Sequence, residues 1–215
     1  VARDASREEF GHFAARFLHP GVQALSWAPR VSHADRAGYE ARARADGLAQ
    51  FAFTQRDGNG LVPAAPRDEY VPVYLIEPFA GNEAAVGFDL ASNAARKAAL
   101  ERAAATGAAT GTEPITLVQE TGSQQGYLVL APAYDATPGA SAAAPALLGY
   151  ASGVFRAGDI VSAALAATQS AEIGLSIVDR TNAAAPVPLY GPENADGAST
   201  PPDPYGLVHT RHLHV

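Results

Sequence analysis

The sequence of 215 residues contains no cysteine and no methionine, and Trp27 is its single tryptophan. Without cysteine, the chain forms no disulfide framework and holds no zinc or iron–sulfur site built on thiolates. Lysine is nearly absent as well, because Lys97 stands alone beside fourteen arginines. We interpret the arginine and alanine bias as that of a GC-rich bacterial gene.

Basic runs are also missing, and the net charge is −7. A nucleic-acid partner requires clustered lysine and arginine to displace counterions from phosphates, so the sequence disfavours nucleic acid. An anionic membrane surface is disfavoured for the same reason. No stretch approaches the roughly 18–20 apolar residues of a membrane helix, and no signal peptide is visible.

Catalytic signatures are absent too. The chain has no Gly-x-Ser-x-Gly elbow, no Gly-x-Gly-x-x-Gly and no phosphate-binding Walker loop. We therefore predict no catalytic residue and no cofactor. On a strand, His212 and His214 would share a face, as in a weak metal site; we favour a polar strand at the end of the chain and predict no metal site.

What is present is a chain that is 47% hydrophobic, enough for one large domain or two small ones with a real core. Phe10, Phe13 and Phe17 recur at helical spacing, and Pro20–Gly21 ends that segment. A second helix is expected between Ser32, as its N-cap, and Gly47. Between the two helices, a short apolar stretch, Val22–Trp27, leads into Pro29.

Alternating and β-rich segments follow, interrupted by two further helical patterns. Strands are expected at 50–54, 70–77, 86–90, 114–119, 126–134, 146–156, 172–179, 187–190 and 207–214, and helices at 93–106 and 158–169. Strands joined by links of hairpin length predict antiparallel sheets with helices packed on one face, an α+β class. The chain divides most simply into two sub-domains near Phe155.

A succession of short blocks carries a family resemblance. The blocks are Arg67-Asp-Glu-Tyr-Val-Pro-Val73, Ile76-Glu-Pro78, Gly87-Phe-Asp89, Ala105-Thr-Gly107, Leu117-Val-Gln-Glu120, Pro132-Ala-Tyr134 and Leu148-Gly-Tyr-Ala-Ser-Gly-Val-Phe155. This order resembles the CHASE domain, a sensory ectodomain associated with cyclases and histidine kinases, whose best-known members are plant cytokinin receptors. The resemblance is strong from about Asp68 to Phe155, and it extends loosely back to Trp27 and forward to Gly191.

The resemblance implies a long N-terminal helix followed by two PAS-like lobes with antiparallel sheets. We therefore expect a helical leader or stalk at 1–49, a membrane-distal ligand-binding lobe at 50–156 and a membrane-proximal lobe at 157–215. Flanking helices would anchor the parent receptor, with this domain on the periplasmic face of the bacterial inner membrane. We expect the parent to be a bacterial histidine kinase that senses a small planar ligand such as an adenine-type cytokinin, and a homodimer is an open alternative to a monomer.

The resemblance also implies a ligand site. The relatives bind adenine-derived cytokinins, and the aspartate that accepts hydrogen bonds from the purine matches Asp89. An ionised carboxylate accepts adjacent N–H donors from one planar heterocycle. Gly111 and Ala131 stand where the plant pocket carries bulky apolar groups, which implies a larger or differently shaped pocket. The remaining expected lining residues are Tyr70, Val73, Tyr150, Gly153 and Phe155.

Other interpretations remain open at this point. The aromatic residues Tyr70, Tyr150 and Phe155 could serve ordinary core packing, and Asp89 could supply a favourable charge at the start of the helix after Ser92. The sensor could belong to a diguanylate cyclase with a different ligand. It could also be an untethered periplasmic binding module, or a small α+β hydrolase using acidic residues, namely Glu69, Glu77, Glu83, Asp89, Glu113 and Glu120.

Overall fold

The computed structural model describes residues 5–58, 60–115, 117–118, 126–135, 145–168, 176–180, 184 and 186–191. Its main element is a five-stranded antiparallel sheet in the order β6-β1-β9-β8-β7. The α+β class and the antiparallel sheet expected from the sequence are confirmed, whereas the expectation that helices pack on one face of the sheet was wrong. The strands are β1 (Val22–Pro29), β6 (Leu75–Glu77), β7 (Thr110–Gly111), β8 (Gly126–Tyr134) and β9 (Leu147–Arg156).

Each face of this sheet packs against a different helix. One face carries Ala24, Leu130 and Val154 in the main core, which α3 (Ala94–Thr106) completes with Leu100 and neighbouring alanines. We call it the α3 face. Here the hydroxyls of Tyr134 and Tyr150 donate to carbonyl oxygens of α3, those of Ala104 and Leu100.

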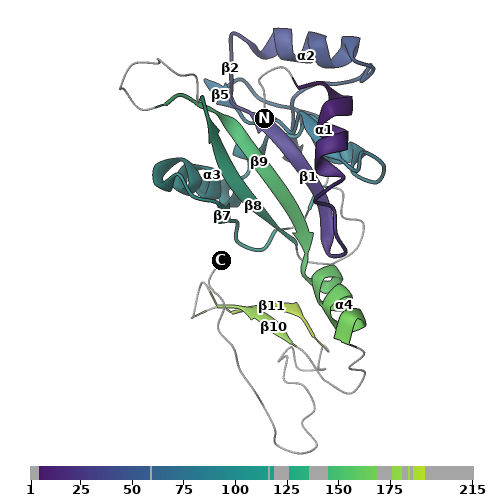
Figure 1. Cartoon of the computed structure of the whole chain (residues 1–215). Coiled ribbons are helices and arrows are strands. Elements are labelled where there is room, and N and C mark those ends of the chain that lie inside the picture. The colour runs from purple at the N-terminus through teal and green to yellow at the C-terminus, as the bar shows by residue number, and fades with distance from the viewer. Residues whose placement is uncertain are drawn as a thin grey trace, which may run out of the picture.

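The opposite face carries a smaller cluster. Trp27 and Leu75 pack there against Phe10 and Ala14 of α1 (Arg7–Ala14). We call it the α1 face. The two helices belong to separate clusters because successive side chains of a strand point to opposite sides of the sheet (Figure 1).

A third cluster lies beside the sheet, at the end labelled α2 in Figure 1. It joins α2 (Arg36–Ala45) to two short antiparallel pairs. One pair is β2 (Val31–Ser32) with β5 (Glu69–Tyr70), and the other is the hairpin β3 (Thr54–Asp57) with β4 (Gly60–Pro63). The buried rings of this cluster are those of Phe51, Phe53 and Tyr70.

The last described elements follow the sheet directly. Helix α4 (Ala157–Thr168) continues from β9, and β10 (Ile177–Asp179) pairs with β11 (Val187–Tyr190). In Figure 1 they lie at the end of the long β8–β9 pair that is remote from α2. None of the helices in the described ranges is long and apolar enough to cross a membrane.

Local signals identified several elements closely. Strand β8 has the expected bounds, and α3 ends at Gly107, whose φ of 69° suits glycine at a helix C-terminus. Asn93, rather than Ser92, caps α3, because its side chain accepts a hydrogen bond from the Arg96 N–H. The strand expected at 207–214, which holds the C-terminal histidines, lies outside the described residues.

Other expectations were wrong. Residues 86–90 form no strand; they lead into the 3-10 turn η2 (Leu90–Ser92) after another such turn, η1 (Glu83–Ala85). The apolar stretch Val22–Trp27, where no strand was expected, is most of β1, which lies inside the sheet between β6 and β9. The strand expected at 70–77 is split between β5 and β6. Among the described residues, the first helix covers only Arg7–Ala14, so the long N-terminal helix remains a prediction.

Candidate ligand site around Asp89

Asp89 belongs to the segment 87–90, which lies between the backbone at Thr54 and the backbone at Val71 and Val73. The Thr54 N–H donates to the Gly87 carbonyl, and the Asp89 N–H donates back to the Thr54 carbonyl. On the other side, the Val73 N–H donates to the Phe88 carbonyl, and Leu90 donates to Val71. Because both sides of residues 87–90 are bonded, Asp89 is fully buried although it belongs to no regular strand.

Gly87 makes this passage possible. Its φ is 83°, and a Cβ atom added there would lie 2.2 Å from the Ala52 carbonyl oxygen. An L side chain would therefore meet both an unfavourable backbone conformation and a direct clash with backbone. The Gly87-Phe-Asp89 block thus has a local structural reason, since the glycine lets the aspartate enter the interior.

The Asp89 carboxylate is bonded through both oxygens. Its Oδ1 accepts from the Val71 N–H at 2.8 Å and from the Ala91 N–H at 3.1 Å, which caps η2. Its Oδ2 accepts from Nη1 of Arg67 at 2.7 Å. The expected charge at a helix start is present, but on η2 rather than on α3.

Burial raises the pKa of the Asp89 carboxyl above its usual value, although the Val71 and Ala91 N–H groups and the Arg67 charge oppose that change. Desolvation disfavours the charged form, while the donors and the nearby cation favour it. Arg67 therefore compensates a carboxylate that water cannot reach, and removal of that cation would leave a buried charge without its counter-ion.

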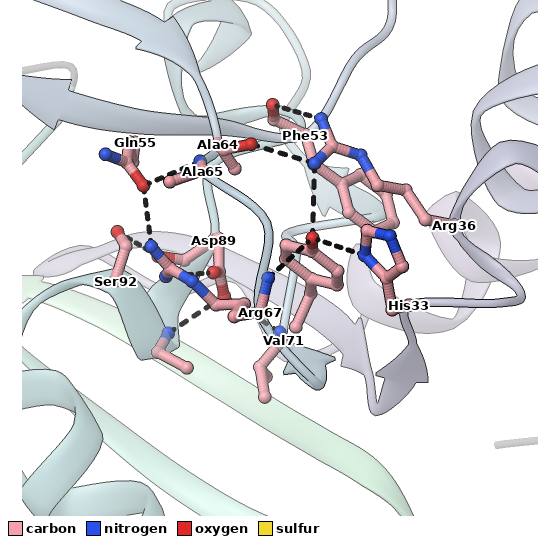
Figure 2. Close-up of polar contacts among 12 residues, drawn as sticks. His33, Arg36, Phe53, Gln55, Ala64, Ala65, Arg67, Val71, Asp89 and Ser92 are labelled. Carbon is pink, nitrogen blue, oxygen red and sulfur yellow. Dashed lines mark hydrogen bonds and ion pairs between the residues drawn. The ribbon is translucent and has the colours of Figure 1, made fainter.

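The Arg67 guanidinium is divided between two acceptors. While Nη1 holds Asp89, Nη2 donates to Oε1 of Gln55 on β3 at 2.6 Å. Figure 2 shows the guanidinium between these two side chains. The Arg67 side chain is 28% exposed, whereas that of Asp89 is 0% exposed. Solvent thus reaches the cation of this pair and not its carboxylate.

Tyr70 connects this pair to α2. Its hydroxyl oxygen accepts from the backbone N–H of Arg67 at 3.1 Å and from Nη1 of Arg36 at 3.3 Å. Nδ1 of His33 lies 3.0 Å from the same oxygen. Because a phenol has one proton to donate and two lone pairs, we infer that Tyr70 donates to His33 Nδ1. Figure 2 draws these contacts of His33, Arg36 and Arg67 as dashed lines.

A small cavity lies between the sheet and the segment that carries Asp89. Its volume is about 20 Å³, and its lining includes Val73, Phe88 and Arg96 but not Asp89. Such a volume admits one water molecule and no ring system. Burial lowers the pKa of Arg96 to about 10, with the charge of Arg56 adding to the effect. A planar ring system would fit this cavity only if side chains moved.

The structure separates the expected lining residues. Tyr70 and Asp89 both contact Arg67, while Val73 and Tyr150 belong to the main core on the α3 face. The strand registers place the other four on the α1 face, because they alternate with or pair across from residues of known side. These four are Gly111, Ala131, Gly153 and Phe155. The eight residues therefore do not surround one cavity in this structure.

Two of these residues have clear packing roles here. A Cβ atom at Gly153 would lie 2.8 Å from the Phe155 ring, so that ring covers the glycine. The Phe155 ring also stacks on Tyr127, with 5.3 Å between centroids. Their part in ligand binding remains a prediction.

Sequence reasoning missed the residues that hold Asp89 in place. The sequence shows Arg67 only within a block of the resemblance and gives no pattern that indicates Gln55 or Arg36. The available signal was physical, since a buried carboxylate requires a cation or several donors nearby. Within the described ranges, no three histidine, aspartate or glutamate side chains come together to hold a metal ion.

The sequence matches one family model and is similar to curated proteins. The family model described as the CHASE domain matches residues 3–190. Among curated proteins, "Probable histidine kinase 6" from Oryza sativa subsp. japonica is 27% identical over 198 residues, which is 89% of this chain. "Probable histidine kinase 4" from the same organism is 30% identical over 213 residues, or 94% of this chain. The chain spans 19% of the length of each relative.

Proposed function

The chain belongs to the CHASE family of sensory domains, and from that premise we propose that it is the extracytoplasmic ligand-sensing part of a transmembrane receptor histidine kinase. The family match over residues 3–190 is the observation that carries this proposal. The similarity to rice proteins named as histidine kinases supports a kinase output. We place the receptor in a bacterial inner membrane with this domain in the periplasm.

The architecture proposed for the receptor follows the family. Residues 1–49 would form the leader, 50–156 the membrane-distal PAS-like lobe and 157–215 the membrane-proximal one. In this arrangement β1 of the leader completes the sheet of the distal lobe, because it lies between β6 and β9. Signalling would be a shift between two arrangements of these parts, driven by the difference in ligand affinity between them.

We propose a small planar ligand such as an adenine-type cytokinin, with Asp89 as the acceptor of its N–H donors. The supporting feature is a buried carboxylate between two backbone segments and beside a partly exposed arginine. A functional site commonly carries a titratable group whose pKa is perturbed by burial and by a specific partner. Because the residues around Asp89 are tightly packed, binding requires side chains to move.

Calorimetric titration with N6-isopentenyladenine, adenine, amino acids and carboxylates tests the ligand proposal. Asp89→Ala should weaken binding by about 1–3 kcal/mol, because the ligand's donors would lose their acceptor. Asp89→Asn retains the side-chain shape and should also weaken binding, which separates loss of the acceptor from loss of the fold. Circular dichroism checks that each variant is folded.

Asp46→Ala is the matched control, because it removes one negative charge from the exposed C-terminus of α2. Its affinity should equal that of the unaltered chain. Equal affinities for the folded Asp89 variants and the unaltered chain would remove Asp89 from the site. The sequence flanking this segment in its gene tests the receptor itself, since apolar helices on both sides and a kinase domain are required.

A further inference from the structure

The carboxylate oxygen of Asp89 that a ligand would reach already accepts a hydrogen bond from another side chain. Oδ1 of Asp89 is committed to two backbone N–H groups, which only a rearrangement of Val71 or Ala91 would release. Its Oδ2 is bonded to a side chain, that of Arg67. A ligand donor can therefore reach the carboxylate with least change of the backbone by taking the place of Arg67.

The guanidinium resembles the proposed guest in its hydrogen bonding. It is planar and presents N–H donors at fixed angles to a carboxylate, as an aminopurine edge does. We propose that Arg67 is an intramolecular competitor of the ligand, which must displace its guanidinium from Asp89. This inference rests on the proposed function, and it makes Arg67 a determinant of affinity and specificity.

The contacts of Arg67 allow the side chain to leave while its backbone stays. The Arg67 backbone N–H is held by the Tyr70 hydroxyl, and the side chain is partly exposed. The second bond of the guanidinium goes to Gln55 on the β3–β4 hairpin. Displacement therefore breaks two side-chain bonds and leaves the donors of Val71 and Ala91 on the carboxylate. Gln55 acts as a positioning residue, because it holds Arg67 over Asp89 without contacting the carboxylate.

Calorimetry with N6-isopentenyladenine as the probe tests the competition. Arg67→Ala removes the competitor, so the affinity should rise at least about tenfold, the equivalent of one charge-assisted hydrogen bond. Gln55→Ala loosens the competitor and should give a smaller gain of about two- to fivefold. Arg67→Gln, which removes the charge while keeping an N–H donor, serves if the alanine variant is poorly folded. Arg16→Ala, which removes an exposed arginine beyond α1, should change nothing.

The double variant Arg67→Ala with Asp89→Asn should lose the gain, because the added affinity depends on the vacated carboxylate. A merely structural arginine would lower affinity when removed and would not show this dependence. If the unaltered chain binds the probe through Asp89 while Arg67→Ala and Gln55→Ala bind equally or more weakly, the competition is refuted and the proposed function stands. If no variant binds the probe or the other ligands tested, both proposals fail.

Discussion

At the scale of single residues, the candidate site depends on a glycine with an unusual backbone conformation and on a buried carboxylate paired with an arginine. Gly87 allows its segment to pass under the Ala52 carbonyl, and this passage buries Asp89 two residues later. Burial would be unfavourable for a lone carboxylate, so Arg67 and two backbone donors accompany it. The glycine, the aspartate and the arginine therefore act as one unit.

The role of Gly87 can be measured against a matched glycine. Gly81 has nearly the same φ, 82° against 83°, but nothing lies within 4 Å of its added Cβ atom. Gly81→Ala should cost about 1 kcal/mol of unfolding free energy, the cost of left-handed backbone alone. Gly87→Ala should cost at least about 3 kcal/mol, because a clash with backbone is added. Urea unfolding measures both, and equal losses would show that the passage under Ala52 is not a steric constraint.

At the scale of elements, α2 is attached to the site by polar side chains. Arg36 donates through Nε to Glu40, through Nη1 to the Ala64 carbonyl and to Tyr70. Its guanidinium also lies over the rings of Phe53 and Tyr70. Glu40 accepts from the Phe53 N–H at 3.0 Å. Side chains of α2 thus bind three residues of the third cluster, Phe53, Ala64 and Tyr70. Tyr70 is the residue that also contacts Arg67.

The attachment of α2 should depend on pH through Glu40. Burial opposes the ionised form, but the Phe53 N–H and the Arg36 guanidinium outweigh it and hold the pKa of Glu40 below its ordinary value of 4.5. Since the folded-state pKa is the lower one, Glu40 stabilises the fold above pH 4.5, and this contribution is lost as pH falls through the folded-state value.

Urea unfolding at neutral pH and near pH 3 tests this dependence. Glu40→Gln should lower stability by about 1–3 kcal/mol at neutral pH and by less near pH 3, because the contribution of the ionised carboxylate declines once the pH falls below 4.5. Glu101→Gln is the control, because that carboxylate is 68% exposed and lies 3.9 Å from Lys97. A Glu40→Gln effect that is the same at both pH values would contradict the assignment.

At the scale of the whole molecule, the five-stranded sheet unites segments that are distant in sequence. Strands β1 and β9, which pair with each other, are separated by more than a hundred residues of sequence. Helices α3 and α1 pack on opposite faces of these strands. The β10–β11 pair differs, because its residues are all half-buried or exposed. The described part of the chain therefore has an uneven distribution of buried contacts.

Hydrogen exchange followed by mass spectrometry should reveal that distribution. Amides of β1, β8 and β9 should exchange most slowly, with opening free energies close to that of global unfolding. Amides of β10 and β11 should exchange faster, because few buried contacts oppose their opening. The Tyr150→Phe variant, which lacks the bond to the Leu100 carbonyl, serves as a check on the link between β9 and α3. Equal protection of the two sheets would contradict this description.

The sequence by itself determined the elements whose signals are local. Strand β8 and helix α3 could be predicted because period-2 alternation and helix capping act within a few residues. Strand β1 was missed because Trp27 and Ala28 are buried on opposite faces, so its pattern shows no alternation. Residues 86–90 were wrongly expected as a strand because their hydrogen-bond partners, Thr54, Val71 and Val73, hold them in a form that local propensity does not predict.

The candidate site likewise has features that the sequence indicates and features that only the tertiary structure shows. The resemblance indicated Asp89 as a ligand-binding residue, which stays a prediction, and the family, which the family match confirmed. The separation of Gly153 and Phe155 from Tyr150 follows from the alternation of side chains along β9, whereas only the tertiary structure placed Arg67 on Asp89. The physical reason is that pairing across the chain depends on which segments meet in space, and that choice is made by the packing of the whole core rather than by the residues next to each charge.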